Sequence, residues 1–132
     1  YALDVMYENI PADLLQTELD TCWVRVGGAD PSAYVKKYSG RAPVVHLKDY
    51  VGEKSKHMYE LIGVDSTAKE EETAKFELRP VGDGVQDFPS IIAACEQAGT
   101  EWLVVEQDTP SGGLSSLVCA ERSRNYLKTI GQ

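Results

Sequence analysis

Apolar runs along the chain predict four strands of one buried sheet. They cover residues 14–23, 43–48, 76–81 and 101–106. Apolar runs without regular alternation are typical of parallel sheets, because helices cover both faces of such sheets. In the first run, the alternation of a strand would place Asp20 and Cys22 on one face and Leu19 on the other.

Helical spacing and capping signals predict helices between the strands. Asp30-Pro31 opens one of them, since aspartate is a good N-cap and proline suits the first helical turn, and Gly40 ends it. Asp87 caps another, in which apolar residues recur at helical spacing. This helix is expected over 88–98, and further helices are expected over 2–9 and 114–130. Strands that alternate with helices indicate an α/β fold with a parallel sheet and right-handed crossovers.

Residues 51–75 are the least regular part of the chain, and they carry charged groups at 53–56 and 70–72. We expect either a long, partly ordered excursion beside a functional site or a solvated surface loop. Residues 58–62 are apolar enough for one or two helical turns. Gly82-Asp83-Gly84 predicts a tight turn.

Composition narrows the possible partners. The 132 residues suffice for one domain, and 13 basic against 21 acidic side chains give a formal net charge of −8. This balance argues against nucleic acid, and no apolar run is long enough for a membrane span. The cysteines fit no zinc motif, so we expect buried free thiols in a reducing cytoplasm. The chain begins with Tyr1 rather than Met, which suggests a piece of a longer protein or a processed product.

Three potential ligands stand near the ends of three of the predicted strands. Asp20 lies in the first run, His46 ends Pro-Val-Val-His, and Glu106 ends Trp-Leu-Val-Val-Glu. A parallel sheet gathers the carboxyl ends of its strands at one rim. Carboxylates and an imidazole that converge there would form a metal site or an acid–base site.

Five motifs in order resemble the sugar phosphate isomerase/epimerase family, whose members are xylose-isomerase-like TIM barrels. The family includes ketose epimerases, inosose dehydratase and hydroxypyruvate isomerase. The resemblance covers nearly the whole chain from about residue 14. The motifs that carry it are Glu18 to Trp23 with Gly27 to Pro31, Gly40-Arg41 with Val45 to Asp49, Gly82 to Gly84 with Asp87-Phe88, Val104 to Asp108, and Ser123 to Leu127.

The resemblance implies that residues 1–132 form one partial domain, the parallel (β/α)4 half of a TIM barrel that carries strands five to eight. It also implies a divalent metal (Mn, Mg or Co) held by Asp20, His46 and Glu106. The family's fourth ligand, a glutamate on strand four, would lie before Tyr1. Ketose epimerases have a substrate-binding histidine where this chain has Trp23, which leaves room for relatives that act on keto-sugars, keto-glycosides or inositol derivatives.

The implied chemistry is proton transfer through an enediolate of a sugar or keto-sugar, with Glu106 as one of the two acid–base groups. Lys48 is a candidate substrate-binding residue, the alternative being a surface lysine. Trp23 is a candidate platform for a sugar ring, the alternative being ordinary packing. Asp49 and Asp108 are expected to orient the groups that bind metal and substrate.

A half barrel would leave two sheet edges unpaired, and open edges invite pairing. We therefore expect a homo-oligomer or an assembly with the missing half of the barrel. Two functions stay open. The chain is either the C-terminal half of a metal-dependent isomerase, epimerase, lyase or dehydratase, inactive on its own, or a non-catalytic module that binds a ligand or self-associates.

Overall fold

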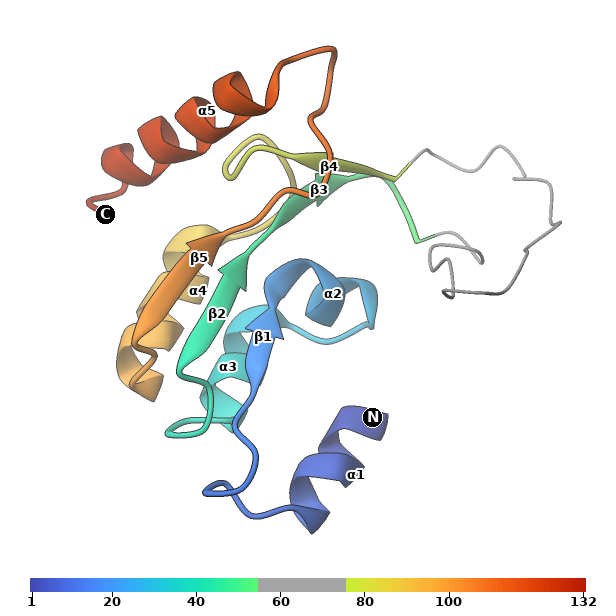
Figure 1. Ribbon diagram of the computed structural model, residues 1–132, viewed down its shortest axis with the longest axis vertical. Helices are drawn as coiled ribbons and strands as arrows, with labels where there is room; N and C mark the ends of the chain where they lie inside the picture. The colour runs from blue at the N-terminus through green and yellow to red at the C-terminus, as the bar shows by residue number, and fades with distance from the viewer. Residues whose placement is uncertain (55–75) are drawn as a thin grey trace, which may run out of the picture.

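The structure is a computed structural model that describes residues 1–54 and 76–132. The helices in these ranges are α1 (Ala2–Asn9), α2 (Thr21–Val26), α3 (Pro31–Lys37), α4 (Phe88–Ala98) and α5 (Ser116–Thr129). The strands are β1 (Glu18–Asp20), β2 (Val44–Leu47), β3 (Asp49–Val51), β4 (Glu77–Arg79) and β5 (Trp102–Val105). A parallel sheet has the order β1-β2-β5, and β3 and β4 form a separate antiparallel pair (Figure 1).

The core lies between the parallel sheet and the helices α3 and α4, which lie behind the sheet in Figure 1. Leu19, Val45 and Leu47 extend from the strands into this core and are at most 2% exposed. Side chains alternate between the two faces of a strand, so their neighbours Asp20 and His46 face away from these helices. The helices contribute Val35, Phe88, Ile91, Ile92 and Cys95 to the same core.

The register of the sheet aligns the polar ends of the strands. Asp20 lies opposite His46, and His46 lies opposite Val104. Glu106 follows directly after β5, and its backbone N–H donates to the carbonyl oxygen of Leu47 at 3.2 Å. The three strands therefore deliver an aspartate, a histidine and a glutamate to one end of the sheet.

The predicted strand over 14–23 is correct only for Glu18–Asp20. The strand β1 ends at Asp20, and the helix α2 begins with Thr21. Asp20 causes this change of direction, because its carboxylate accepts a hydrogen bond from the backbone N–H of Trp23 at 3.0 Å and so caps α2. Cys22 consequently does not share a strand face with Asp20 and is fully buried.

The prediction that residues 76–81 add a fourth parallel strand is also wrong. The strand β4 pairs with β3 in antiparallel fashion, with Asp49 opposite Arg79. An apolar run indicates a buried strand but carries no information about its partner or its direction. The described part of the parallel sheet therefore has three strands.

The predicted helices are present and two predicted N-caps are confirmed, but α3 ends at Lys37 with Tyr38 as its C-cap and not at Gly40. Asp30 accepts from the N–H of Ala33 at 2.7 Å, and Asp87 accepts from the N–H of Ser90 at 3.3 Å. The expected turn at 82–84 is present, and Gly82 has a φ of 95°, which favours glycine. Most of the expected excursion, including the possible helical turns at 58–62, lies outside the described residues.

Two polar clusters hold α1 against the rest of the fold. The carboxylate of Asp4 accepts from the hydroxyl of Tyr34 at 2.6 Å and pairs with the ammonium of Lys37 at 2.8 Å. The guanidinium of Arg41 donates to the carbonyl oxygens of Tyr7 and Ile10 at 2.7 and 2.6 Å. Arg41 therefore packs beside a helix end rather than at the sheet rim.

The three cysteines, Cys22, Cys95 and Cys119, are buried and free, as expected from the sequence. Burial, with the nearby charge of Asp20, raises the pKa of the Cys22 thiol to about 12. Within the ranges 1–54 and 76–132, every helix is too short or too polar to cross a membrane.

Candidate metal centre

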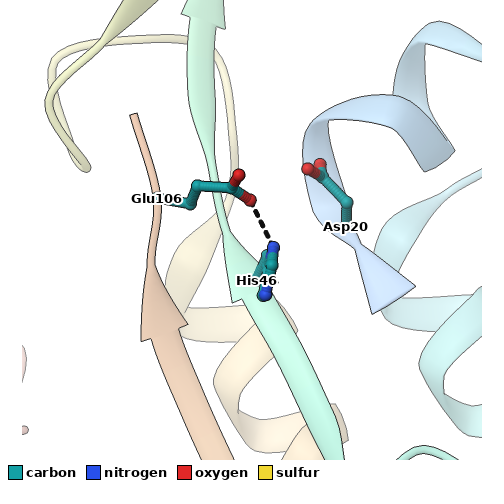
Figure 2. A group of neighbouring side chains, drawn as sticks. All are labelled: Asp20, His46 and Glu106. Atoms are coloured by element: carbon teal, nitrogen blue, oxygen red, sulfur yellow. Dashed lines mark hydrogen bonds and ion pairs between the residues drawn. The ribbon is translucent and has the colours of Figure 1, made fainter. Parts of the chain in front are cut away.

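Three potential metal ligands converge at the carboxyl end of the parallel sheet. Asp20 ends β1, His46 lies in β2, and Glu106 follows β5 (Figure 2). One ligand atom from each of these side chains lies within 4.8 Å of the other two. All three side chains are partly buried. The structure thus brings together the three residues that sequence analysis singled out, and their role as ligands stays a prediction.

The imidazole of His46 contacts two carboxylates. Its Nδ1 atom hydrogen bonds to Glu106, and its Nε2 atom pairs with Glu18. Sequence analysis missed Glu18 as a site residue, although its position two residues before Asp20 places both side chains on one face of β1. That spacing was the available signal.

Lys48 supplies a buried positive charge to this centre. Its Nζ atom lies 2.9 Å from Asp108, 3.4 Å from Asp20 and 3.5 Å from Glu106, and its side chain is 3% exposed. Burial by itself would lower the pKa of Lys48, but the hydrogen bond with Asp108 and the charges of Asp20 and Glu106 raise it overall. Lys48 therefore stays charged and neutralises one of three nearby carboxylates. Its low exposure excludes the alternative of a surface lysine.

Asp20 has two structural roles besides its potential role as a metal ligand. It caps α2 and pairs with Lys48. Burial raises the pKa of the Asp20 carboxyl, and the N–H of Trp23 and the charge of Lys48 offset this only in part. A divalent cation beside Asp20 would favour its ionised form, because opposite charges stabilise each other in a partly buried site.

Asp49 lies close in sequence to His46 and Lys48, but its carboxylate binds another part of the fold. It is fully buried and accepts from the backbone N–H groups of Tyr50, Gly82, Gly84 and Gln86 at 2.9 to 3.1 Å. Burial raises its pKa, and these donors oppose the shift. Asp49 therefore fastens the loop after β4, and its hydrogen bonds do not extend to His46 or Lys48 as the sequence analysis expected. Asp108, in contrast, contacts Lys48 directly.

Trp23 borders the centre from the first turns of α2. Its ring stacks on Phe76 with centroids 5.8 Å apart and an interplanar angle of 18°. The Nζ atom of Lys48 lies 5.3 Å from the centroid of the Trp23 ring. The ring thus packs within an aromatic cluster beside the carboxylates, and its use as a sugar platform stays a prediction.

A cavity of about 290 Å³ runs along β1 and α2. Glu18, Asp20 and Trp23 line it together with mostly apolar residues of α1, β1, α2 and α3 and of the segment after α2. His46, Lys48 and Glu106 are not among its lining residues. The cavity therefore adjoins the candidate centre at Asp20 and is not centred on it.

The donor set fits a hard or borderline divalent cation. Two carboxylates and one imidazole suit Mn²⁺, Mg²⁺ or Co²⁺, and three protein ligands leave positions for substrate oxygens. The Asp20, Glu106 and Asp108 carboxylates exceed the single charge of Lys48 by two, so the centre is electrostatically suited to a dication.

Comparison with known proteins gives a structural match without a close sequence relative. No protein-family model matches the chain, and no curated protein matches it. A crystal structure of a sugar phosphate isomerase/epimerase from Parabacteroides distasonis ATCC 8503 matches 97% of the chain with a TM-score of 0.70 and 22% identity. A second crystal structure, described in the same words, matches 96% with a TM-score of 0.67 and 20% identity.

These matches concern the fold. The chain spans 35% of the length of each of the two solved proteins. At this level of identity the likeness shows a shared arrangement of the backbone and leaves activity to be argued from the site. The chain therefore has the α/β fold, with a parallel sheet, of part of a sugar phosphate isomerase/epimerase.

Proposed function

We propose that this chain is the metal-binding part of a metal-dependent sugar or keto-sugar isomerase or epimerase. The observation that carries the proposal is the convergence of Asp20, His46 and Glu106 from three adjacent parallel strands, with ligand atoms within 4.8 Å of one another. Catalytic groups of (β/α) barrels lie at this end of the strands. The fold shared with the two solved sugar phosphate isomerase/epimerases supports the same reading.

The chemistry that a bound divalent cation supplies is polarisation of a sugar carbonyl, which makes a proton on the adjacent carbon removable. Glu106 is the group of this chain that would take that proton, and in an isomerisation it could return it to the neighbouring carbon. In an epimerisation the second acid–base group, on the opposite face of the carbon, would deliver the new proton. Its carboxylate is held by His46 on one oxygen and by Lys48 at 3.5 Å on the other. This fixed orientation suits a residue that must meet one carbon atom of a bound sugar.

Lys48 is the proposed contact for a substrate oxygen. Its ammonium has three donors, and the carboxylates of Asp108, Asp20 and Glu106 keep it charged and in place. Asp108 is the nearest of these partners and is proposed to orient Lys48. Trp23, beside the ammonium, is proposed to carry the apolar face of the sugar ring.

A metal titration tests the proposal. We expect the wild-type chain to bind Mn²⁺ in calorimetry. Asp20→Asn and Glu106→Ala should each lower the affinity for Mn²⁺ by about 10–100-fold or more, because substitution of a residue that merely supports a ligand already costs this much. Asparagine is chosen at position 20 because it keeps a cap for α2 and loses only the charge. Glu101→Ala removes an exposed carboxylate at the other end of β5 and serves as the control. Equal Mn²⁺ affinity in all four proteins would refute the site.

A second proposal concerns assembly, and the edges of the sheet support it. The outer strands β1 and β5 each have one neighbour in the described sheet, and Trp102 of β5 is 66% exposed. Unpaired parallel edges bind further strands. We propose that the other half of a closed barrel covers these edges, since each solved neighbour is much longer than this chain. The proposal would be refuted if light scattering showed a compact monomer and this monomer melted cooperatively.

A further inference from the structure

Glu18 is an acidic residue beside the candidate metal centre to which the proposed function assigns no role. It begins β1, two residues before Asp20, and lies opposite Val44 of the neighbouring strand. Its carboxylate pairs with the Nε2 atom of His46. The side chain of Glu18 is 59% exposed, whereas that of His46 is 22% exposed. An exposed acid thus reaches inward to a more buried partner.

The two nitrogen atoms of His46 face different surroundings. Nδ1 faces Glu106, on the side of the ring where Asp20 also lies (Figure 2). Nε2 points away from both of these side chains in the same view and meets Glu18. The ring nitrogen that binds a metal is set by the hydrogen bond that the other nitrogen makes, commonly to a carboxylate.

We propose that Glu18 is the positioning residue of the metal centre: it accepts a hydrogen bond from the protonated Nε2 of His46, which leaves the unprotonated Nδ1 as the ligand atom. This inference rests on the proposed function, because it assumes that His46 binds the cation. Glu18 acts through His46 and is not itself a ligand. Its carboxylate lies beyond the imidazole ring, and it is absent from the group whose ligand atoms lie within 4.8 Å of one another.

If Glu18 has this role, its substitution should change the affinity for metal and leave the stability of the fold nearly unchanged. The Glu18 carboxylate is exposed, and an ion pair that water reaches from one side contributes little to the stability of a protein. The loss of Glu18 should therefore leave the melting temperature nearly unchanged and should appear in the affinity for metal. A purely structural role would give the opposite pattern.

The experiment uses the full chain and Zn²⁺, a diamagnetic probe that binds carboxylate and imidazole ligands. The chain has two histidines, so the ¹⁵N resonances of the rings form two sets, and His57→Gln identifies those of His46. We expect the Zn²⁺-bound wild type to show a proton on Nε2 and a coordinated Nδ1. We expect Glu18→Ala to weaken Zn²⁺ binding about 10–100-fold and to shift the Nε2 resonance of His46.

Two matched variants sharpen the test. Glu18→Gln keeps an oxygen acceptor of the same length, so its loss of affinity should be smaller than that of Glu18→Ala. Glu101→Ala removes the same charge from an exposed position at the start of β5 and should leave both the affinity and the ring spectrum unchanged.

Three outcomes would overturn the inference. The first is an unchanged Zn²⁺ affinity in Glu18→Ala while Asp20→Asn still weakens binding. The second is a coordinated Nε2 atom in the wild type. The third is a loss in Glu18→Gln as large as that in Asp20→Asn, which would make Glu18 a direct ligand. If the wild type binds no metal, the proposed function fails. The contact between Glu18 and His46 can then still be tested in the metal-free protein, where an unchanged Nε2 resonance in Glu18→Ala would refute it.

Discussion

The substitution Asp49→Asn should destabilise the protein strongly, although it changes one buried atom. One carboxylate oxygen of Asp49 accepts from Tyr50 and Gln86 at 2.9 and 3.1 Å, and the other accepts from Gly82 and Gly84 at 3.0 and 2.9 Å. An asparagine replaces one of these oxygens with an NH₂ group, which donates and does not accept. Two backbone N–H groups would then lack an acceptor.

The magnitude follows from the cost of an unsatisfied donor. A buried donor without a partner costs about 1–3 kcal/mol, so two cost about 2–6 kcal/mol. Asparagine also removes the penalty of burying a charge, which is the main reason that the pKa of Asp49 is raised, so part of the loss is recovered. We therefore expect the free energy of unfolding to fall by a net amount of about 2 kcal/mol, in the lower part of that range, against the about 5–15 kcal/mol typical of a domain.

Urea denaturation followed by circular dichroism measures this change as a shift of the midpoint at constant slope. The matched control is Asp83→Asn in the same loop, because Asp83 is exposed and pairs with Arg122 at 3.2 Å. An exposed ion pair contributes at most about 1 kcal/mol. If Asp49→Asn is no more destabilising than Asp83→Asn, the role assigned to the Asp49 carboxylate is wrong.

Two further predictions concern the loop after β4 and the attachment of α1. Gly84→Ala should destabilise the protein more than Gly99→Ala in the same urea assay. A Cβ atom at Gly84 would lie 2.2 Å from an oxygen of Asp49, whereas at Gly99 it meets nothing within 4 Å and adds only the strain of a φ of 77°. Equal losses would contradict the close packing of Gly84 against Asp49. Hydrogen bonds from Lys37 and Tyr34 lower the pKa of Asp4 well below its unfolded value of about 3.9. The stability contributed by Asp4 is therefore complete above that unfolded value and is lost as the pH falls through the lower folded pKa. Unfolding free energies measured from about pH 7 to pH 2 should fall less steeply in Asp4→Asn than in the wild type below about pH 4, and parallel curves would exclude this contribution.

The comparison between sequence and structure shows where local signals suffice. Asp30 and Asp87 cap their helices as predicted, because capping depends on residues three positions apart in the chain. The convergence of Asp20, His46 and Glu106 was also predictable. It needs only parallel neighbouring strands, whose carboxyl ends meet at one rim whatever the rest of the fold does.

Other features depend on residues that are distant in the chain, and the sequence left them open. The direction of β4 depends on its pairing with β3, and an apolar run is the same for either direction. The target of Asp49 depends on a loop more than 30 residues later, which delivers three of its four N–H donors. Asp20 was expected inside a strand, because the pattern of apolar residues does not show that its carboxylate caps a helix.

The amino-acid sequence by itself determined the class of the fold, the helices other than α2 and the three residues at the strand ends. These follow from hydrophobic periodicity and short-range hydrogen bonding, which depend on residues that are close together in the chain. Only the tertiary structure decided that Lys48 is a buried counter-charge, that Asp49 anchors a loop and that Glu18 meets His46. The partners of a charged side chain are set by the packing of separate elements, and no pattern within one element contains that information.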